Sequence, residues 1–121
     1  MTLPRKGSKR IVVEGNTYRY VGYLSGYLSE KRTGELDELT IGADIERGEL
    51  LRAYFSYEPI RQAYLSVGRT LGKFGAFPPY VVAQTIRIGL RSGWTPTTGG
   101  GMRTLGRLDD VINYSDLKPD V

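Results

Sequence analysis

The stretch PPYVVAQTIRIGLRSGWTP, residues 78–96, carries the clearest secondary-structure signals in this chain of 121 residues. A proline pair can open a helix, because proline at the first helical position loses no hydrogen bond that the helix needs. Small and apolar residues then recur at helical spacing and predict one narrow apolar face. These residues are Val81, Val82, Thr85, Ile86, Gly89 and Leu90. Gly93 suits a left-handed residue after the helix, and Pro96 prevents a restart. The pattern predicts a helix over residues 79–92 that covers a sheet.

The first half of the chain predicts that sheet. Residues 10–14, RIVVE, and residues 17–24, TYRYVGYL, are rich in β-branched and aromatic side chains. The Gly15-Asn16 pair between them suits a two-residue hairpin turn. Residues 38–45 and 50–57 predict a second hairpin by the same reasoning.

The secondary structure of two further segments is less clear from the sequence. Residues 59–71 have helical spacing of apolar side chains and favour a short helix, although a glycine within them argues against a long one. Residues 103–114 fit either a last strand with a turn or a short helix. Trp94 is expected to fold back into the core after the helix cap.

Taken together, these elements predict one α+β domain over the whole chain, with an antiparallel sheet of four or five strands and one main helix on a face. We expect flexible ends at 1–8 and 115–121.

Composition excludes several classes of function. The chain has no cysteine and no histidine, which removes Ser–His and Cys–His nucleophile pairs and the usual zinc sites. No apolar run approaches the ~18 residues that suggest a membrane span. The basic N-terminus is not followed by an apolar stretch of signal-peptide length. We therefore expect a cytoplasmic protein with no membrane contact.

No pattern of residues points to catalysis, a metal or a cofactor. The segment GRTLGKF, residues 68–74, resembles a phosphate-binding loop but has three residues between the glycines where that motif needs four. Two acidic pairs, Asp37-Glu38 and Asp109-Asp110, could in principle bind magnesium, but solvated surface is the simpler interpretation. We expect a protein that is not an enzyme and that uses no cofactor.

Charge is distributed unevenly along the chain, around a net value of +4. Residues 35–49 contain six acidic side chains and one basic side chain, Arg47. No acidic residue lies between Glu58 and Asp109. That interval contains Arg61, Arg69, Lys73, Arg87, Arg91, Arg103 and Arg107. Such asymmetry is typical of a protein that meets a charged partner.

Two motifs resemble those of a group of small uncharacterised bacterial proteins. The first is the opening R-I-V-V-E-G-x-x-Y-R-Y at residues 10–20, and the second is P-x-x-V-x-x-x-I-x-x-x-L-x-x-G-W-x-P at residues 79–96. The resemblance implies an α+β domain and implies no reaction. More distantly, a hairpin followed by a helix is similar to some small bacterial toxin-immunity proteins.

Two functions fit these observations. The first is a non-enzymatic bacterial interaction protein, of the immunity or inhibitor type, that binds another protein through arginines and an exposed tyrosine-rich face. The candidate residues are Arg87, Arg91, Arg103, Tyr20, Tyr23 and Tyr54. The alternative is a nucleic-acid-associated accessory protein that uses Arg87, Arg91, Arg103 and the basic N-terminal arm. A homodimer is compatible with both.

Overall fold

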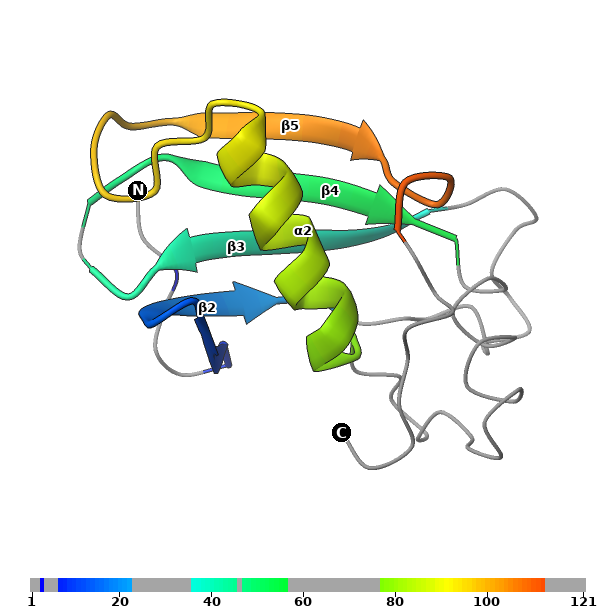
Figure 1. Ribbon diagram of the computed structural model, residues 1–121, viewed down its shortest axis with the longest axis horizontal. Coiled ribbons are helices and arrows are strands. Elements are labelled where there is room, and N and C mark those ends of the chain that lie inside the picture. Colours follow the sequence, from blue (N-terminus) through cyan, green and yellow to red (C-terminus); the bar gives the residue numbers. More distant parts are fainter. Residues whose placement is uncertain (1–2, 4–6, 23–35, 46, 57–76, 113–121) are drawn as a thin grey trace.

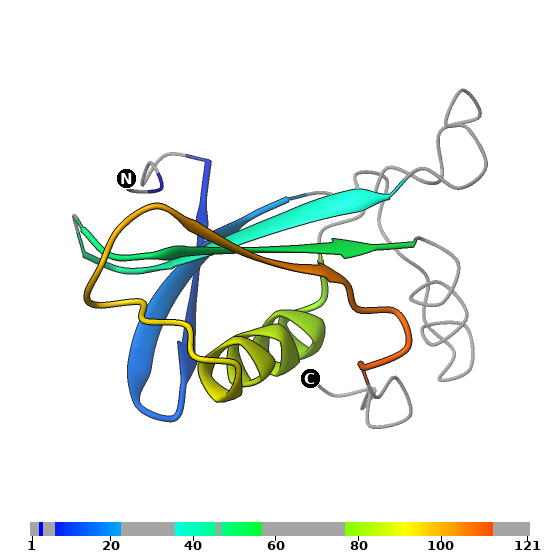
Figure 2. The ribbon, with the colours of Figure 1, turned by 90° about the horizontal axis from the view of Figure 1, so that it is seen from above.

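The computed structural model describes residues 3, 7–22, 36–45, 47–56 and 77–112. These residues form a five-stranded sheet with one helix packed on one of its faces, which confirms the expected α+β fold (Figures 1 and 2). The elements in chain order are β1 (Lys9–Val13), β2 (Asn16–Val21), β3 (Asp37–Ala43), β4 (Leu50–Phe55), α2 (Pro79–Arg91) and β5 (Met102–Arg107). The strands lie side by side in the same order, from β1 to β5.

The first hairpin forms as expected, but its turn lies one residue earlier than the sequence predicted. Val13 pairs with Asn16, so the two turn residues are Glu14 and Gly15. Both have positive φ, 52° at Glu14 and 82° at Gly15. Positive φ at both central residues is the mark of a type I′ turn, whose twist matches that of the two strands. Glycine suits the second of these positions, which leaves Asn16 as the first residue of β2.

The second hairpin is also present. Strand β3 pairs antiparallel with β4, and it pairs antiparallel with β2 on its other side. Leu39 and Ile41 of β3 are fully buried and belong to the core, and Thr40 between them is also buried, at 7% exposure. Tyr18 and Tyr20 of β2 are buried on the same face, while the intervening Arg19 is partly exposed.

The fifth strand corrects the expectation of a purely antiparallel sheet. Strand β5 pairs with β4 in the parallel direction, so the sheet is mixed. The physical reason is the helix between them in the chain. A chain that leaves β4, crosses the face of the sheet as a helix and returns beside β4 runs in the direction of β4. The sequence predicted the helix but did not predict which edge of the sheet the chain would reach after it.

The helix ends as the sequence predicted. Gly93 follows the cap residue Ser92 and has φ 97°. The Trp94 N–H donates to the carbonyl oxygen of Gly89 at 2.9 Å, and the Gly93 N–H donates to that of Leu90 at 3.3 Å. These two bonds form a Schellman motif, in which a left-handed glycine satisfies the last carbonyl groups of the helix. The motif turns the chain sharply, and the Trp94 side chain enters the core.

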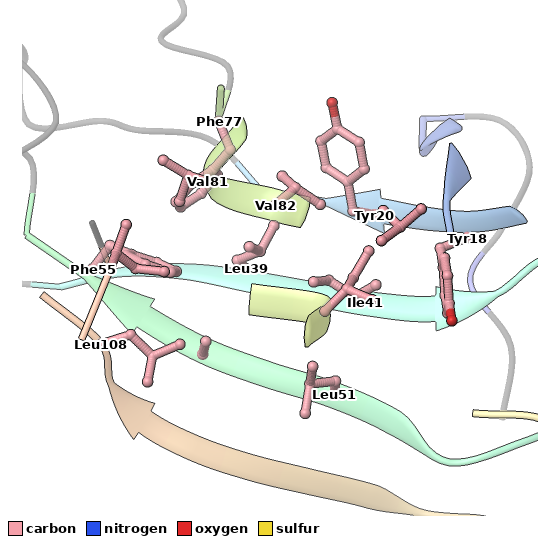
Figure 3. Close-up of a cluster of buried hydrophobic side chains, with 14 of the residues drawn as sticks. Tyr18, Tyr20, Leu39, Ile41, Leu51, Phe55, Phe77, Val81, Val82 and Leu108 are labelled. Carbon is pink, nitrogen blue, oxygen red and sulfur yellow. The ribbon is translucent and has the colours of Figure 1, made fainter. Parts of the chain in front are cut away.

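The core lies between the sheet and α2 (Figure 3). Val82 and Ile86 of the helix are fully buried, and Trp94 is only 3% exposed, so its expected place in the core is confirmed. Phe77, just before the helix, packs edge to face on Phe55 of β4, with ring centroids 5.3 Å apart. The helix approaches the sheet closely at Gly89, where a Cβ atom would lie 2.6 Å from a methyl group of Leu51. Glycine at that position sets the depth at which the helix sits.

The C-terminal segment is a strand and a turn. Residues 108–112 follow β5 and form a turn in which the Val111 N–H donates to the carbonyl oxygen of Leu108 at 2.9 Å. Asp109 departs from the expectation of a solvated carboxylate, because its side chain is only 4% exposed. It accepts a hydrogen bond from the Ser56 N–H at 2.9 Å and pairs with Arg107 at 2.6 Å. This carboxylate therefore joins the end of β4 to the end of β5.

Some expectations fall on residues outside the described ranges. These are the helix over 59–71, the last two residues of the segment 103–114, and the C-terminal end at 115–121. In the N-terminal arm Leu3 is described, and its side chain lies near Gly42 on the face of the sheet opposite α2. Within the described ranges, no helix has the length and apolar character that crossing a membrane requires.

Replacing the tryptophan that follows the cap tests this account of the core. We expect Trp94→Ala to lower the free energy of unfolding by about 3–5 kcal/mol, because it leaves a cavity between the helix and the sheet. Urea titration followed by far-UV circular dichroism measures this. The control is Val111→Ala at a side chain 56% exposed, which should change stability by less than about 0.5 kcal/mol. A loss below about 1 kcal/mol for Trp94→Ala would contradict the packing described here.

Candidate functional site

An aromatic pair lies where the end of α2 meets the start of β2. The rings of Tyr18 and Trp94 have their centroids 5.8 Å apart and are tilted by 33°. The Trp94 indole N–H donates to the backbone carbonyl of Glu49 at 2.7 Å, so its polar atom is satisfied although the ring is buried. Burial raises the pKa of Tyr18 above its ordinary value of 10.0, and the charge of Glu14 acts in the same direction. The Tyr18 hydroxyl therefore stays protonated.

The loop after the helix is held against the sheet by Glu49. The Glu49 carboxylate accepts hydrogen bonds from the Thr95 N–H and from Arg103 Nε, both at 3.1 Å. The backbone N–H of Glu49 donates in return to the carbonyl oxygens of Thr95 and Thr98, at 3.3 and 3.2 Å. The backbone donor of Thr95, and next the Arg103 guanidinium, hold the pKa of Glu49 below its ordinary value of 4.5. One glutamate thus fixes the path of residues 95–98.

Glycine at position 48 allows the same loop to come close. A Cβ atom on Gly48 would overlap the carbonyl oxygen of Pro96, and the residue has φ 138°, which side chains rarely allow. The turn between β3 and β4 and the loop after α2 are therefore in backbone contact. A substitution at Gly48 must displace the loop or strain the turn.

A groove of about 730 Å³ opens beside this loop. Tyr18, Trp94 and Leu90 line it together with several hydroxyl and amide side chains. Its lining residues come from the start of β2, the end of β3 and the loop after α2: Asn16, Thr17, Tyr18, Ala43, Asp44, Ile45, Leu90, Trp94, Thr95, Pro96, Thr97 and Thr98. Ile45 is 47% exposed at the rim. The groove therefore offers apolar side chains, an apolar rim and uncharged hydrogen-bonding groups.

The groove carries little net charge. Among the described residues that line it, Asp44 is the one with a charge, and its carboxylate pairs with Arg19 Nε at 3.0 Å. Both side chains are largely buried, at 25% and 17% exposure. The ion pair leaves the groove close to neutral, so a charged ligand gains little there.

The three arginines predicted from the sequence do not converge on one site. Arg87 and Arg91 are both exposed on α2, as expected. Arg87 Nε lies 3.6 Å from the carboxylate of Glu14, across from the tip of the first hairpin, which bends toward the helix (Figure 2). Arg103 of β5 forms an ion pair with Glu49, the residue that precedes β4. Among the described residues only Arg91 of the three has no carboxylate partner.

The three predicted tyrosines also separate. Tyr20 is buried at 5% exposure, which takes it out of any tyrosine-rich surface (Figure 3). Tyr54 is partly exposed and lies on the opposite face of the sheet, because its neighbours Ala53 and Phe55 are buried under the helix. Tyr23 lies outside the described residues. Tyr54 alone remains a described surface candidate.

Sequence reasoning missed the groove itself. The sequence TTGGG at residues 97–101 is typical of a flexible loop, yet Thr98 is bonded to Glu49, and Thr97 and Thr98 line the groove. The available signal was the run W-T-P-T-T at residues 94–98, which places three hydroxyl side chains around a proline directly after a helix cap. Such a run is suited to hydrogen bonding at a surface, but the partner elements come from residues some fifty and eighty positions earlier in the chain.

Comparison of the chain with protein-family models, with curated proteins and with solved structures found no match. Across the described part of the chain, no three acidic side chains gather where they could hold a metal ion.

The contact at Gly48 leads to a prediction with a matched control. We expect Gly48→Ala to lower the free energy of unfolding by about 2 kcal/mol or more, because a backbone clash and a strained φ act together. Gly100→Ala is the control, since a Cβ atom there meets nothing within 4 Å and its φ is not positive. Thermal melts of both variants beside the wild type measure the difference. Equal stability of the two variants would mean that the loop does not lie against the turn.

The Glu49 interactions predict a pH dependence. Because the folded state lowers the pKa of Glu49, its stabilising contribution is full above the ordinary pKa of 4.5. That contribution is lost as the pH falls through the lower, folded-state value. We expect Glu49→Gln to lose less stability than the wild type between about pH 5 and about pH 3, measured by urea unfolding. Glu14→Gln controls for the removal of one negative charge. Parallel profiles for wild type and Glu49→Gln would contradict the interaction.

Proposed function

We propose that this protein is a non-enzymatic interaction protein that binds a segment of another protein in the groove beside Trp94. The observation that carries the proposal is the chemistry of the groove, which is lined by apolar side chains, among them the exposed Ile45, and by uncharged hydrogen-bonding groups. Its volume of about 730 Å³ is in the range of specific binding pockets. An immunity or inhibitor protein of bacterial origin is the form of this proposal that the sequence motifs favour.

A polypeptide segment matches this groove better than a charged ligand does. An apolar side chain of the partner would pack against Leu90 and Ile45, and the backbone groups of the partner would meet the threonine hydroxyls. Contact surfaces of this kind have apolar centres and polar rims. Ile45, 47% exposed at the rim, adds apolar area that is free for contact in the described structure.

Ion pairing weakens the nucleic-acid alternative. Arg87 and Arg103 each face a carboxylate, and so do three further arginines of the sheet. These further pairs are Arg19 with Asp44, Arg52 with Glu38, and Arg107 with Asp109. Exposed pairs contribute only about 0–1 kcal/mol each, so phosphates could displace some of them. The carboxylates nevertheless lower the positive potential that nonspecific nucleic-acid binding needs.

Selection of peptides from a random phage-displayed library tests the proposal. We expect enriched peptides to share an apolar anchor and to bind the wild type at micromolar dissociation constants or better, measured by fluorescence anisotropy. Thr97→Trp, at an exposed wall residue, should weaken binding about tenfold or more, which is about 1.4 kcal/mol. Thr104→Trp is the control, because Thr104 is an exposed threonine of β5 outside the groove.

Two results would contradict the proposal. One is a set of enriched peptides whose affinity Thr97→Trp leaves unchanged. The other is tight binding of a labelled DNA or RNA strand that persists above about 150 mM salt, where purely electrostatic contacts weaken steeply. If the double variant Arg87→Glu, Arg91→Glu then removed that binding without changing the thermal melt, the nucleic-acid function would replace the one proposed here.

A further inference from the structure

Strand β1 is one edge of the sheet, and its outward backbone groups can be identified. In the described residues β2 is the only strand that pairs with it. The type I′ turn joins Val13 to Asn16 by hydrogen bonds, so the backbone of Val13 faces β2. Backbone direction alternates along an antiparallel strand, so the N–H and C=O groups of Arg10 and Val12 face away from β2. The Asp44 N–H donates to the Thr17 carbonyl at 3.2 Å on the far side of β2, which agrees with this alternation.

The two edges of the sheet differ. Strand β5, the other edge, contains an irregularity where its register against β4 shifts between Arg52 and Ala53, and Gly106 there has φ 80°. Bulges of this kind disrupt an edge and discourage pairing with another strand. Strand β1 pairs with β2 over five consecutive residues without a shift. It is therefore the regular edge, and within the described ranges its outward side carries no further strand.

We infer that β1 pairs antiparallel with β1 of a second copy of this chain, with Val12 directly opposite Val12 of the second copy. The two sheets would then form one continuous sheet of ten strands. The inference does not depend on the groove or on the partner proposed for it, because it uses only the edge strand and its turn.

The alternation of the backbone restricts the register. A residue whose backbone groups face outward must lie opposite another such residue of the second copy. For Arg10 and Val12 this allows three registers: Arg10 opposite Arg10, Arg10 opposite Val12, and Val12 opposite Val12. Arg10 opposite Arg10 would place like charges together. Arg10 opposite Val12 would leave each Val12 beside a charged side chain. Val12 opposite Val12 places two apolar side chains together at the centre, and Val12 is 58% exposed in the single chain.

The spacing of like charges favours the same register. With Val12 at the centre, Arg10 of each copy lies beyond Val13 of the other copy, at the level of its turn residues Glu14 and Gly15. The two Arg10 residues are then four positions apart, or about 14 Å along the strands at 3.4 Å per residue. This exceeds the screening length of about 8 Å at physiological salt, so their repulsion is small.

Sedimentation velocity measures the oligomeric state directly. The chain has a mass of 13.5 kDa, and we expect a species of twice that mass to form with rising concentration. Val12→Pro should abolish it, because proline removes an outward N–H that the sheet itself does not use. Val12→Thr keeps the N–H and the β-branched shape, and it should weaken the dimer less. A monomer at all concentrations up to about 100 µM, well above the micromolar range of specific complexes, would overturn the inference.

Disulfide trapping tests the register independently of how Val12→Pro folds. The chain contains no cysteine, so a single introduced cysteine can cross-link only to its counterpart in another copy. Opposed residues in a ladder have Cα atoms about 5.5 Å apart, within the range a disulfide allows. We expect Val12→Cys to cross-link rapidly on mild oxidation and Arg10→Cys to remain mostly reduced. Equal rates for both variants, or faster cross-linking of Arg10→Cys, would overturn the register.

Discussion

The contact between Trp94 and the sheet is the interaction on which the rest of the structure depends. The Schellman motif at Gly93 reverses the chain, and the indole then lies against Tyr18 and donates to the carbonyl of Glu49. This one side chain joins the end of the helix to β2 and to the residue that precedes β4. Without it, the loop after the helix would lose the anchor that lets the chain return beside β4 as β5.

The groove is a consequence of that anchor. Once Trp94 is fixed, Glu49 can bond to the loop from both its backbone and its carboxylate, and the threonines of the loop face the ends of β2 and β3. The same glutamate engages Arg103, which the sequence had suggested as a contact for a partner. The fold therefore uses part of the basic charge internally and leaves a near-neutral groove beside the loop.

The spacing of apolar residues along the chain predicted the strands and the helix well, because these elements depend on interactions between residues close in sequence. The spacing of Val82 and Ile86 indicated the buried face of the helix, and Gly93 indicated its end. The alternation in β2 indicated that Tyr18 and Tyr20 share a face, although not that this face is the buried one, so Tyr20 was assigned to a surface. Alternation distinguishes two faces, while only the position of the helix decides which of them is covered.

The sequence by itself determined the two hairpins, apart from the position of the first turn, and the helix with its cap, because each depends on residues within a few positions of one another. It also indicated that Trp94 folds back after the cap, although the partners Tyr18 and Glu49 come from distant segments. The tertiary structure alone decided the parallel direction of β5, the pairing of the arginines with carboxylates, and the groove. Each of these joins segments tens of residues apart, such as Glu49 with Thr95 and Arg103. Spacing along the chain contains no information about such contacts, because they depend on where the helix crosses the sheet and on which edge the chain joins next.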